Sequence, residues 1–234
     1  SDLLDHAQES DRMKTAFIEH VSHEIRTPLN VITGFAQVIT NPDYQLDEED
    51  RNRMLNDIGK NTIEITNIVN ELLEVSEEES REHYERSDSV DVNQLCEEIM
   101  TQAGMMNNGR LTLNYKNLLD DGYLLRTNRQ ALEKILTQLM KNAVKFTNEG
   151  TVELKVRERA GHGGVEFTIT DTGIGIAQEN QEKVFERFYK VDSFKQGLGL
   201  GLPMSRKMAE LLDGSLEIDK TYMKGTRFVL VLPS

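Results

Sequence analysis

The chain has 234 residues, of which 38% are hydrophobic and 29% are charged, and these values are typical of one large or two modest folded domains. No stretch approaches the ~18–20 uninterrupted apolar residues that cross a bilayer, so we predict no membrane span. The single cysteine, Cys96, excludes an intramolecular disulfide framework.

The charge is divided unevenly along the chain. Residues 1–88 contain 21 acidic and 8 basic residues, whereas residues 89–234 contain 19 of each, so the whole net charge of −13 lies in the first part. An acidic surface disfavours binding to nucleic acid or anionic lipid, while a neutral second part accepts a polyanionic nucleotide more easily. We therefore predict two domains, 1–88 and 89–234, and no nucleic-acid partner.

The first domain has the pattern of a helical hairpin. Apolar residues recur in steps of three and four over residues 13–39 and again over 54–75, with a turn signal at Asn41-Pro42-Asp43. A lone hairpin leaves much of its apolar stripe in water, and pairing with a second copy into a four-helix bundle would cover it. The sequence therefore predicts a homodimer.

From residue 91 the pattern becomes mixed. We expect helices near 91–105, 128–145, 179–188 and 203–213, and strands near 110–116, 122–126, 151–158, 164–170, 215–219 and 226–232. The polar residues 77–89 suit a helix tail that runs into a linker. The second domain is thus predicted to be an α+β sandwich with a mostly antiparallel sheet.

One histidine of the first helix has a context that suits chemistry. His23 is followed by Glu24, which can hold the ring in one tautomer and take up its proton while the other nitrogen acts as a nucleophile. Thr27 lies one turn further on the same face, where its hydroxyl can position a water. An isolated histidine on a polar face is ordinarily only solvated, and His20, beside Glu19, competes in the same register.

The second domain contains two segments that suit a nucleotide. Asn142 and Lys145 share a helix face, and they offer an amide oxygen for Mg²⁺ and a charge for phosphate. Asp171 follows an expected strand and can accept a hydrogen bond from an exocyclic amine, while Gly173 and Gly175 let the backbone approach the base. An isolated Asp-x-Gly-x-Gly is more often a turn than a site.

A third segment adds groups for the phosphates. Val184-Phe-Glu-Arg-Phe-Tyr-Lys190 supplies Arg187 and Lys190, and Gly197-Leu-Gly-Leu-Gly-Leu-Pro203 opens a helix whose backbone N–H groups face an anion. The glycine spacing is not that of a Rossmann fingerprint, and no Walker-type Gly-Lys-Ser/Thr occurs.

In this order the segments resemble a bacterial sensor histidine kinase. The string His23-Glu-Ile-Arg-Thr-Pro-Leu is similar to the phosphoacceptor box, and the three later segments are similar to the boxes of the ATP-binding domain, with residues 191–196 as the ATP lid. The resemblance implies an all-α hairpin, dimeric as a four-helix bundle, followed by an α+β sandwich of the GHKL ATPase type. It implies ATP and Mg²⁺ as cofactors and the receiver domain of a response regulator as partner.

The resemblance also assigns roles to residues. It implies catalytic roles for His23, Glu24 and Thr27, and Mg²⁺ binding by Asn142. The implied nucleotide contacts are Asn142, Lys145, Asp171, Gly173, Gly175, Ile176, Arg187, Tyr189, Lys190, Gly197, Gly199, Leu200, Gly201, Leu202 and Thr226. The implied location is cytoplasmic, as part of a longer protein that can be membrane-anchored.

Two departures from the family pattern keep other functions open. Gln138 stands where the first amide of the asparagine box is expected, and Lys190 stands where many relatives have arginine, which replaces a bidentate fork with a point charge. These support a phosphatase or scaffold with weak kinase activity. A second alternative is an ATPase of the wider superfamily shared with gyrase and MutL, which has no use for a phosphoacceptor helix.

Overall fold

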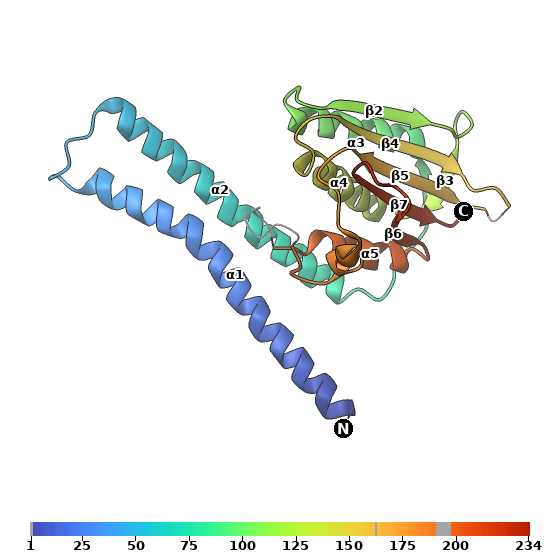
Figure 1. Cartoon of the computed structure of the whole chain (residues 1–234), viewed down its shortest axis with the longest axis horizontal. Coiled ribbons are helices and arrows are strands. Elements are labelled where there is room, and N and C mark those ends of the chain that lie inside the picture. The colour runs from blue at the N-terminus through green and yellow to red at the C-terminus, as the bar shows by residue number, and fades with distance from the viewer. Residues whose placement is uncertain (1, 162, 191–197) are drawn as a thin grey trace. The chain divides into compact units, whose positions relative to one another are not determined.

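The computed structural model describes residues 2–161, 163–190 and 198–234, and for residues 2–10 and 13 it describes the helical backbone alone. The chain divides into two compact units (Figure 1). The first contains the described residues up to Glu79 together with Leu198, and the second contains residues 80–190 and 199–234. In the described part of the chain, no helix combines the length and apolar character that a membrane span requires.

The first unit is the predicted helical hairpin. Helix α1 (Asp2–Thr40) runs unbroken through Pro28, and α2 (Glu48–Glu79) lies beside it in the opposite direction (Figure 1). The Asp47 carboxylate accepts the backbone N–H of Asp50 at 2.7 Å and so satisfies a donor that the start of α2 would otherwise leave unpaired. Three acidic residues in the first turn of α2 complement the helix dipole.

The hairpin buries little of its own apolar surface. Apart from Pro28, Ile68 is the only hydrophobic residue described in the hairpin that is buried. Large apolar side chains remain exposed on both helices, namely Ile18, Leu29, Leu55, Ile63, Val69 and Leu73. A helix pair of this kind needs a further partner to cover these faces.

The second unit is a two-layer sandwich. A five-stranded sheet has the order β2-β4-β5-β7-β6, and three helices cover one of its faces (Figure 1). Its strands are β2 (Thr112–Asn117), β4 (Thr151–Glu158), β5 (Val165–Asp171), β6 (Ser215–Ile218) and β7 (Thr226–Leu232). The helices are α3 (Val92–Asn107), α4 (Arg129–Lys145) and α5 (Gly201–Leu211). Only the β2–β4 pair is parallel, so the predicted α+β sandwich with a mostly antiparallel sheet is confirmed.

The core lies between the sheet and α4. Alternate residues of β4 and β5, among them Leu154 and Phe167, are fully buried, as are Leu132, Ile135 and Leu139 of α4. The period of two in the strands and of three to four in the helix is the one that the sequence shows. This packing holds the C-terminal end of α4 beside the end of β5.

Two elements differ from expectation. Strand β1 (Asp88–Asp91) was not expected, because the sequence places its first residues in a polar linker. It pairs with β3 (Leu124–Thr127), which matches the strand expected near 122–126. The helix expected at 179–188 is wrong, because that stretch forms two short 3₁₀ turns, η1 (Gln178–Asn180) and η2 (Lys183–Phe185). Phe188 has a φ of 66°, which ends any helix, and its N–H donates to the Gly199 carbonyl at 3.0 Å.

Helix α5 begins at Gly201, two residues before the expected start, so the glycine-rich segment enters the first turn itself. The predicted domain boundary near residue 88 remains a prediction. Helix α2 ends at Glu79, and the second compact unit takes in residues from Ser80 onward.

Candidate functional site

The end of β5 and the end of α4 are joined by their backbones. The N–H of Ile174 donates to the carbonyl oxygen of Phe146 at 3.2 Å. A side chain at Gly173 would overlap that same oxygen and would come within 2.7 Å of Thr147 Oγ1, so only glycine fits this close approach. The segment from Asp171 to Gly175 therefore lies directly against the helix that carries Asn142.

Asp171 is a buried carboxylate with one oxygen held and the other available. Asp171 is the last residue of β5, and it is 4% exposed. Oδ1 accepts the backbone N–H groups of Gly173 at 2.9 Å and of Thr226 at 3.2 Å. Within the described ranges, Oδ2 accepts no hydrogen bond. Burial raises the pKa of this carboxyl, and the two backbone hydrogen bonds oppose that rise.

The start of β7 closes the other side of this turn. Gly225 has a φ of 155°, and a side chain there would overlap the carbonyl oxygen of Asp171. The carbonyl oxygen of Gly225 also lies against Gly175. Thr226 is consequently buried next to Asp171. The predicted residues Asp171, Gly173, Gly175 and Thr226 thus meet at one end of the sheet.

The first turn of α5 lies against the polar face of α4. A side chain at Gly201 would overlap the amide group of Gln138, and the Gln138 amide in turn donates to Asn142 Oδ1 at 3.4 Å. Gln138, which departs from the expected asparagine box, is therefore in contact with both Asn142 and the glycine-rich turn. Lys145 follows on the same helix, with its ammonium group 5.4 Å from the Phe146 ring centroid.

At the N-terminus of α5, no described side chain caps the N–H groups of the first turn. Leu200 occupies the capping position, and its side chain cannot accept the N–H groups of the first turn. Gly199 lies against Phe188 and Tyr189. The predicted ATP lid at 191–196 lies outside the described residues. Gly197, a predicted contact, lies outside the described residues. Leu202 packs half-buried against the core.

The remaining predicted nucleotide contacts have mixed positions. Ile176 and Tyr189 both pack against the core, and the Tyr189 hydroxyl donates to Asn180 Oδ1 at 2.7 Å. Arg187 is exposed and Lys190 is half-buried, and both lie beyond η2. Their contact with phosphate stays a prediction.

The candidate phosphoacceptor lies on α1. His23 is exposed, whereas His20 is half-buried, which favours His23 as the group that reaches a substrate. Thr27 Oγ1 donates to the His23 carbonyl at 3.3 Å, so both side chains belong to one flank of the helix. Glu24 follows His23 and is half-buried.

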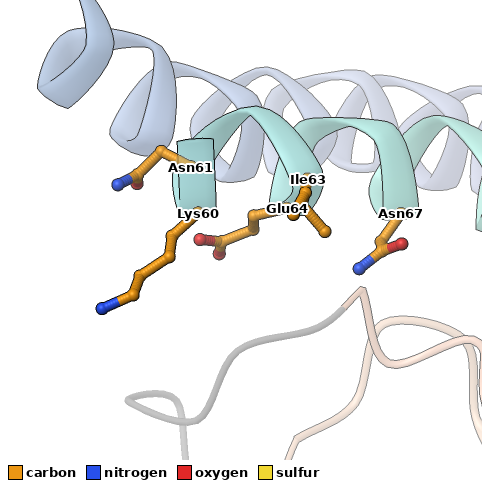
Figure 2. A pocket seen from close by; sticks show the side chains of 5 residues that line it. All are labelled: Lys60, Asn61, Ile63, Glu64 and Asn67. Atoms are coloured by element: carbon orange, nitrogen blue, oxygen red, sulfur yellow. The ribbon is translucent and has the colours of Figure 1, made fainter. Parts of the chain in front are cut away.

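The pocket drawn in Figure 2 is a separate feature. Its described lining belongs to α2 alone, and Lys60, Ile63, Glu64 and Asn67 follow one another at the spacing of a single helix face (Figure 2). Ile63 is 62% exposed in the middle of this polar group. None of the predicted site residues that the structure describes is among these lining residues.

Sequence reasoning missed some neighbours of the site. Thr147 Oγ1 is buried beside Gly173 and has no hydrogen-bond partner within the described ranges. Gln181 donates to the Ile176 carbonyl at 3.3 Å, and the Tyr222 hydroxyl donates to the Asp171 carbonyl at 3.1 Å. None of these residues has a motif spacing, because each contact depends on the folded path of the chain.

Two family profiles match the chain. Residues 13–81 match the His Kinase A (phospho-acceptor) domain, and residues 127–234 match the histidine kinase-, DNA gyrase B- and HSP90-like ATPase. Among the described residues, the first matched segment covers most of the hairpin, and the second covers most of the sandwich.

Relatives of known name span almost the whole chain. The aerobic respiration control sensor protein ArcB of Escherichia coli is 30% identical over 97% of this chain, and the sensor histidine kinase AruS of Pseudomonas aeruginosa is 34% identical over 96%. The chain spans 30% and 23% of the lengths of these two proteins. The solved structure of full-length ShkA in complex with AMPPNP has the same fold, with a TM-score of 0.68, 24% identity and coverage of 91% of this chain and 44% of that one.

Proposed function

The chain belongs to the histidine kinase family, and on that premise we propose that it is the catalytic core of a sensor kinase that phosphorylates His23 from ATP. The observation that carries this proposal is the Asp171 carboxylate, with Oδ1 held by two backbone N–H groups and Oδ2 left to accept a donor. A fixed acceptor in a buried turn suits the exocyclic amine of adenine, and guanine presents an oxygen at that position instead.

The phosphates would lie between α4 and the start of α5. The N–H groups of Gly201 and Leu202, which no described side chain caps, would attract an anion, and Lys145 would add a positive charge. Gln138 contacts both Asn142 and Gly201, and so it braces the two sides of this site. We propose that Arg187, Lys190 and the glycine-rich turn complete the phosphate contacts.

A magnesium ion fits the donors that α4 offers. The part of the chain that the structure describes holds no group of three or more His, Cys, Asp or Glu residues suited to a metal. Mg²⁺ commonly keeps water and phosphate oxygens as most of its ligands, so the Asn142 amide oxygen could serve as the protein ligand. When bound, Mg²⁺ would neutralise charge on the phosphates.

His23 would then act as the nucleophile. One imidazole nitrogen forms a bond to the γ-phosphorus, the bond from that phosphorus to the bridging oxygen breaks, and ADP leaves with the electron pair. Glu24 takes the proton from the other ring nitrogen. An aspartate of a response regulator receives the phosphoryl group as the bond between phosphorus and the His23 nitrogen breaks. In the opposing phosphatase reaction, Thr27 orients a water that attacks this phosphorus, so that the aspartyl P–O bond breaks and inorganic phosphate leaves.

We further propose that the working form is a homodimer. Exposed apolar side chains on both helices, including Leu55 and Leu73, support pairing of two hairpins into a four-helix bundle. The superfamily ATPase remains the second candidate for the nucleotide domain alone, because its turn and glycine-rich segment would also serve hydrolysis.

The test is incubation with γ-labelled ATP and Mg²⁺. We expect label that is stable in base and labile in acid, lost in His23→Ala and retained in the matched control His20→Ala. Label lost only in the His20 variant would identify His20, one helical turn before His23, as the phosphoacceptor. Release of free phosphate without protein label would favour the ATPase, and ATP binding without either product would favour a phosphatase or scaffold.

A further inference from the structure

The Asp171 backbone has a hydrogen-bond partner from outside the recognised motifs. Tyr222 lies in the hairpin between β6 and β7, and its hydroxyl donates to the Asp171 carbonyl oxygen at 3.1 Å. The two residues are 51 positions apart, so this contact exists only in the folded protein. It fixes the peptide plane that follows Asp171.

The Tyr222 ring is itself held in place. The guanidinium of Arg227 lies over the ring, 4.3 Å from its centroid. Arg227 in turn donates to Thr170 Oγ1 at 3.0 Å and pairs with Asp219 at 3.3 Å. Arg227 therefore ties the ring to β5 and to the end of β6.

Asp219 anchors the far side of this group. Its Oδ1 accepts the N–H of Thr221 at 2.9 Å and the hydroxyl of Thr221 at 2.6 Å. These hydrogen bonds, together with Arg227, lower the pKa of the Asp219 carboxyl, so it stays charged near neutral pH. Asp219, Arg227 and Tyr222 thus form a connected set of contacts that holds the Tyr222 hydroxyl against the Asp171 carbonyl.

We propose that Tyr222 is a positioning residue that sets the affinity and specificity of the site for adenine. The inference rests on the proposed role of Asp171. Orientation of the Asp171 peptide determines the direction of its Cα–Cβ bond, and therefore where Oδ2 lies. Oδ1 is already fixed by two N–H groups, so a small rotation of the backbone would shift Oδ2 away from the exocyclic amine.

A purely structural role for Tyr222 predicts a different result. If the hydroxyl only stabilised the hairpin, its loss would lower the Tm and would weaken every purine triphosphate equally. A positioning role predicts that the loss depends on the exocyclic amine. Purine riboside triphosphate, which has hydrogen in place of that amine, separates the two.

The experiment compares Tyr222→Phe with Tyr115→Phe in the full chain. Tyr115 donates to Asn93 Oδ1 at 2.8 Å between α3 and the edge strand β2, so its variant loses a similar bond away from the turn. We expect Tyr222→Phe to weaken a non-hydrolysable ATP analogue by about 3–10-fold and purine riboside triphosphate by much less. Tyr115→Phe should leave both dissociation constants unchanged. Equal weakening of the two ligands, or none, would overturn the inference.

Asp171→Asn, measured in parallel, separates this inference from the function on which it rests. Unchanged ATP binding in that variant would remove the adenine site and the Tyr222 inference together. Weakened binding in Asp171→Asn with unchanged ligand preference in Tyr222→Phe would overturn only the inference. Arg227→Lys, which keeps the charge but not the planar guanidinium, should show the same amine-dependent loss with a smaller amplitude.

Discussion

In the proposed adenine site, a single oxygen of Asp171 would determine which purine base binds. In Asp171→Asn the amide oxygen can keep the two backbone hydrogen bonds, while the NH₂ group replaces Oδ2 and opposes the amine of adenine. We expect ATP to bind about 10–100-fold more weakly. Inosine triphosphate, which has an oxygen at that position, should lose less or gain. Titration calorimetry with both nucleotides measures the change in preference.

The same substitution should not destabilise the empty protein. Burial raises the pKa of Asp171, so the folded state binds this proton more tightly than the unfolded chain does. The contribution of Asp171 to the free energy of unfolding therefore falls as pH rises from the ordinary to the raised pKa. At pH 7 the asparagine variant should have a Tm equal to or above the parent. A large fall in Tm would mean that the charge itself holds the turn.

Thr27 allows a second test at the level of one side chain. Its hydroxyl donates a hydrogen bond to the His23 carbonyl, so the lone pairs of the hydroxyl oxygen can accept a hydrogen bond from water. Thr27→Ala should slow dephosphorylation of the receiver partner about 10-fold or more and change autophosphorylation little. Thr40→Ala is the matched control, because Thr40 makes the same type of bond to Ala36 at 2.8 Å. Equal loss of both reactions in Thr27→Ala would contradict the water-positioning role.

At the scale of elements, Arg110 holds the end of α4 in place. Its guanidinium donates to the carbonyl oxygens of Val144, Thr147 and Asn148 at 3.0, 2.7 and 3.1 Å. These carbonyls lie at the negative end of the helix dipole, next to the Phe146 oxygen that accepts the Ile174 N–H. Arg110→Met should reduce the free energy of unfolding by about 1–2 kcal/mol.

Hydrogen exchange at Ile174 gives this prediction a local measurement. The Ile174 amide should lose protection in Arg110→Met, because its acceptor belongs to the segment that Arg110 fixes. Arg157→Met is a suitable control, since Arg157 pairs with Glu166 across β4 and β5 without touching α4. Unchanged protection at Ile174 would show that the helix end is held by packing alone.

How far the sequence predicts each element depends on where its stabilising contacts come from. The hairpin of β4 and β5 is predicted well, because its alternation of buried and open residues is local. The stretch 179–188 is not, because Phe188 bonds to Gly199 across the segment between them. Strand β1 is missed for a similar reason: its polar residues pair with β3, more than thirty positions away.

The candidate site shows the same division. Asp171, Gly173 and Thr226 carry motif spacing, and the structure brings them together. Tyr222 has no spacing signal, and Gln138 departs from the family pattern, yet both contact site residues. Motifs thus predict the groups that would touch the ligand, whereas the groups that position them emerge only from the fold.

At the scale of the whole molecule, the hairpin should control oligomeric state without changing nucleotide binding. Leu55 and Leu73 on α2 are 49% and 59% exposed, and eighteen residues, or five helical turns, place them on one face. Leu55→Glu combined with Leu73→Glu would place two charges in the apolar seam of a four-helix bundle. We expect a monomer by sedimentation velocity, with an ATP dissociation constant within about twofold of the parent, since the described residues of the proposed nucleotide site belong to the second unit.

Ile63→Glu is the control for that double variant. Ile63 is as exposed as the two leucines, but it lies about 80° around α2 from Leu55, among Lys60, Glu64 and Asn67 (Figure 2). A charge on this polar flank should leave the dimer intact. If Ile63→Glu dissociated the dimer and the leucine variant did not, the seam would lie on the flank drawn in Figure 2. Monomers in the parent protein would instead show that the apolar faces of the hairpin are not covered by a second copy.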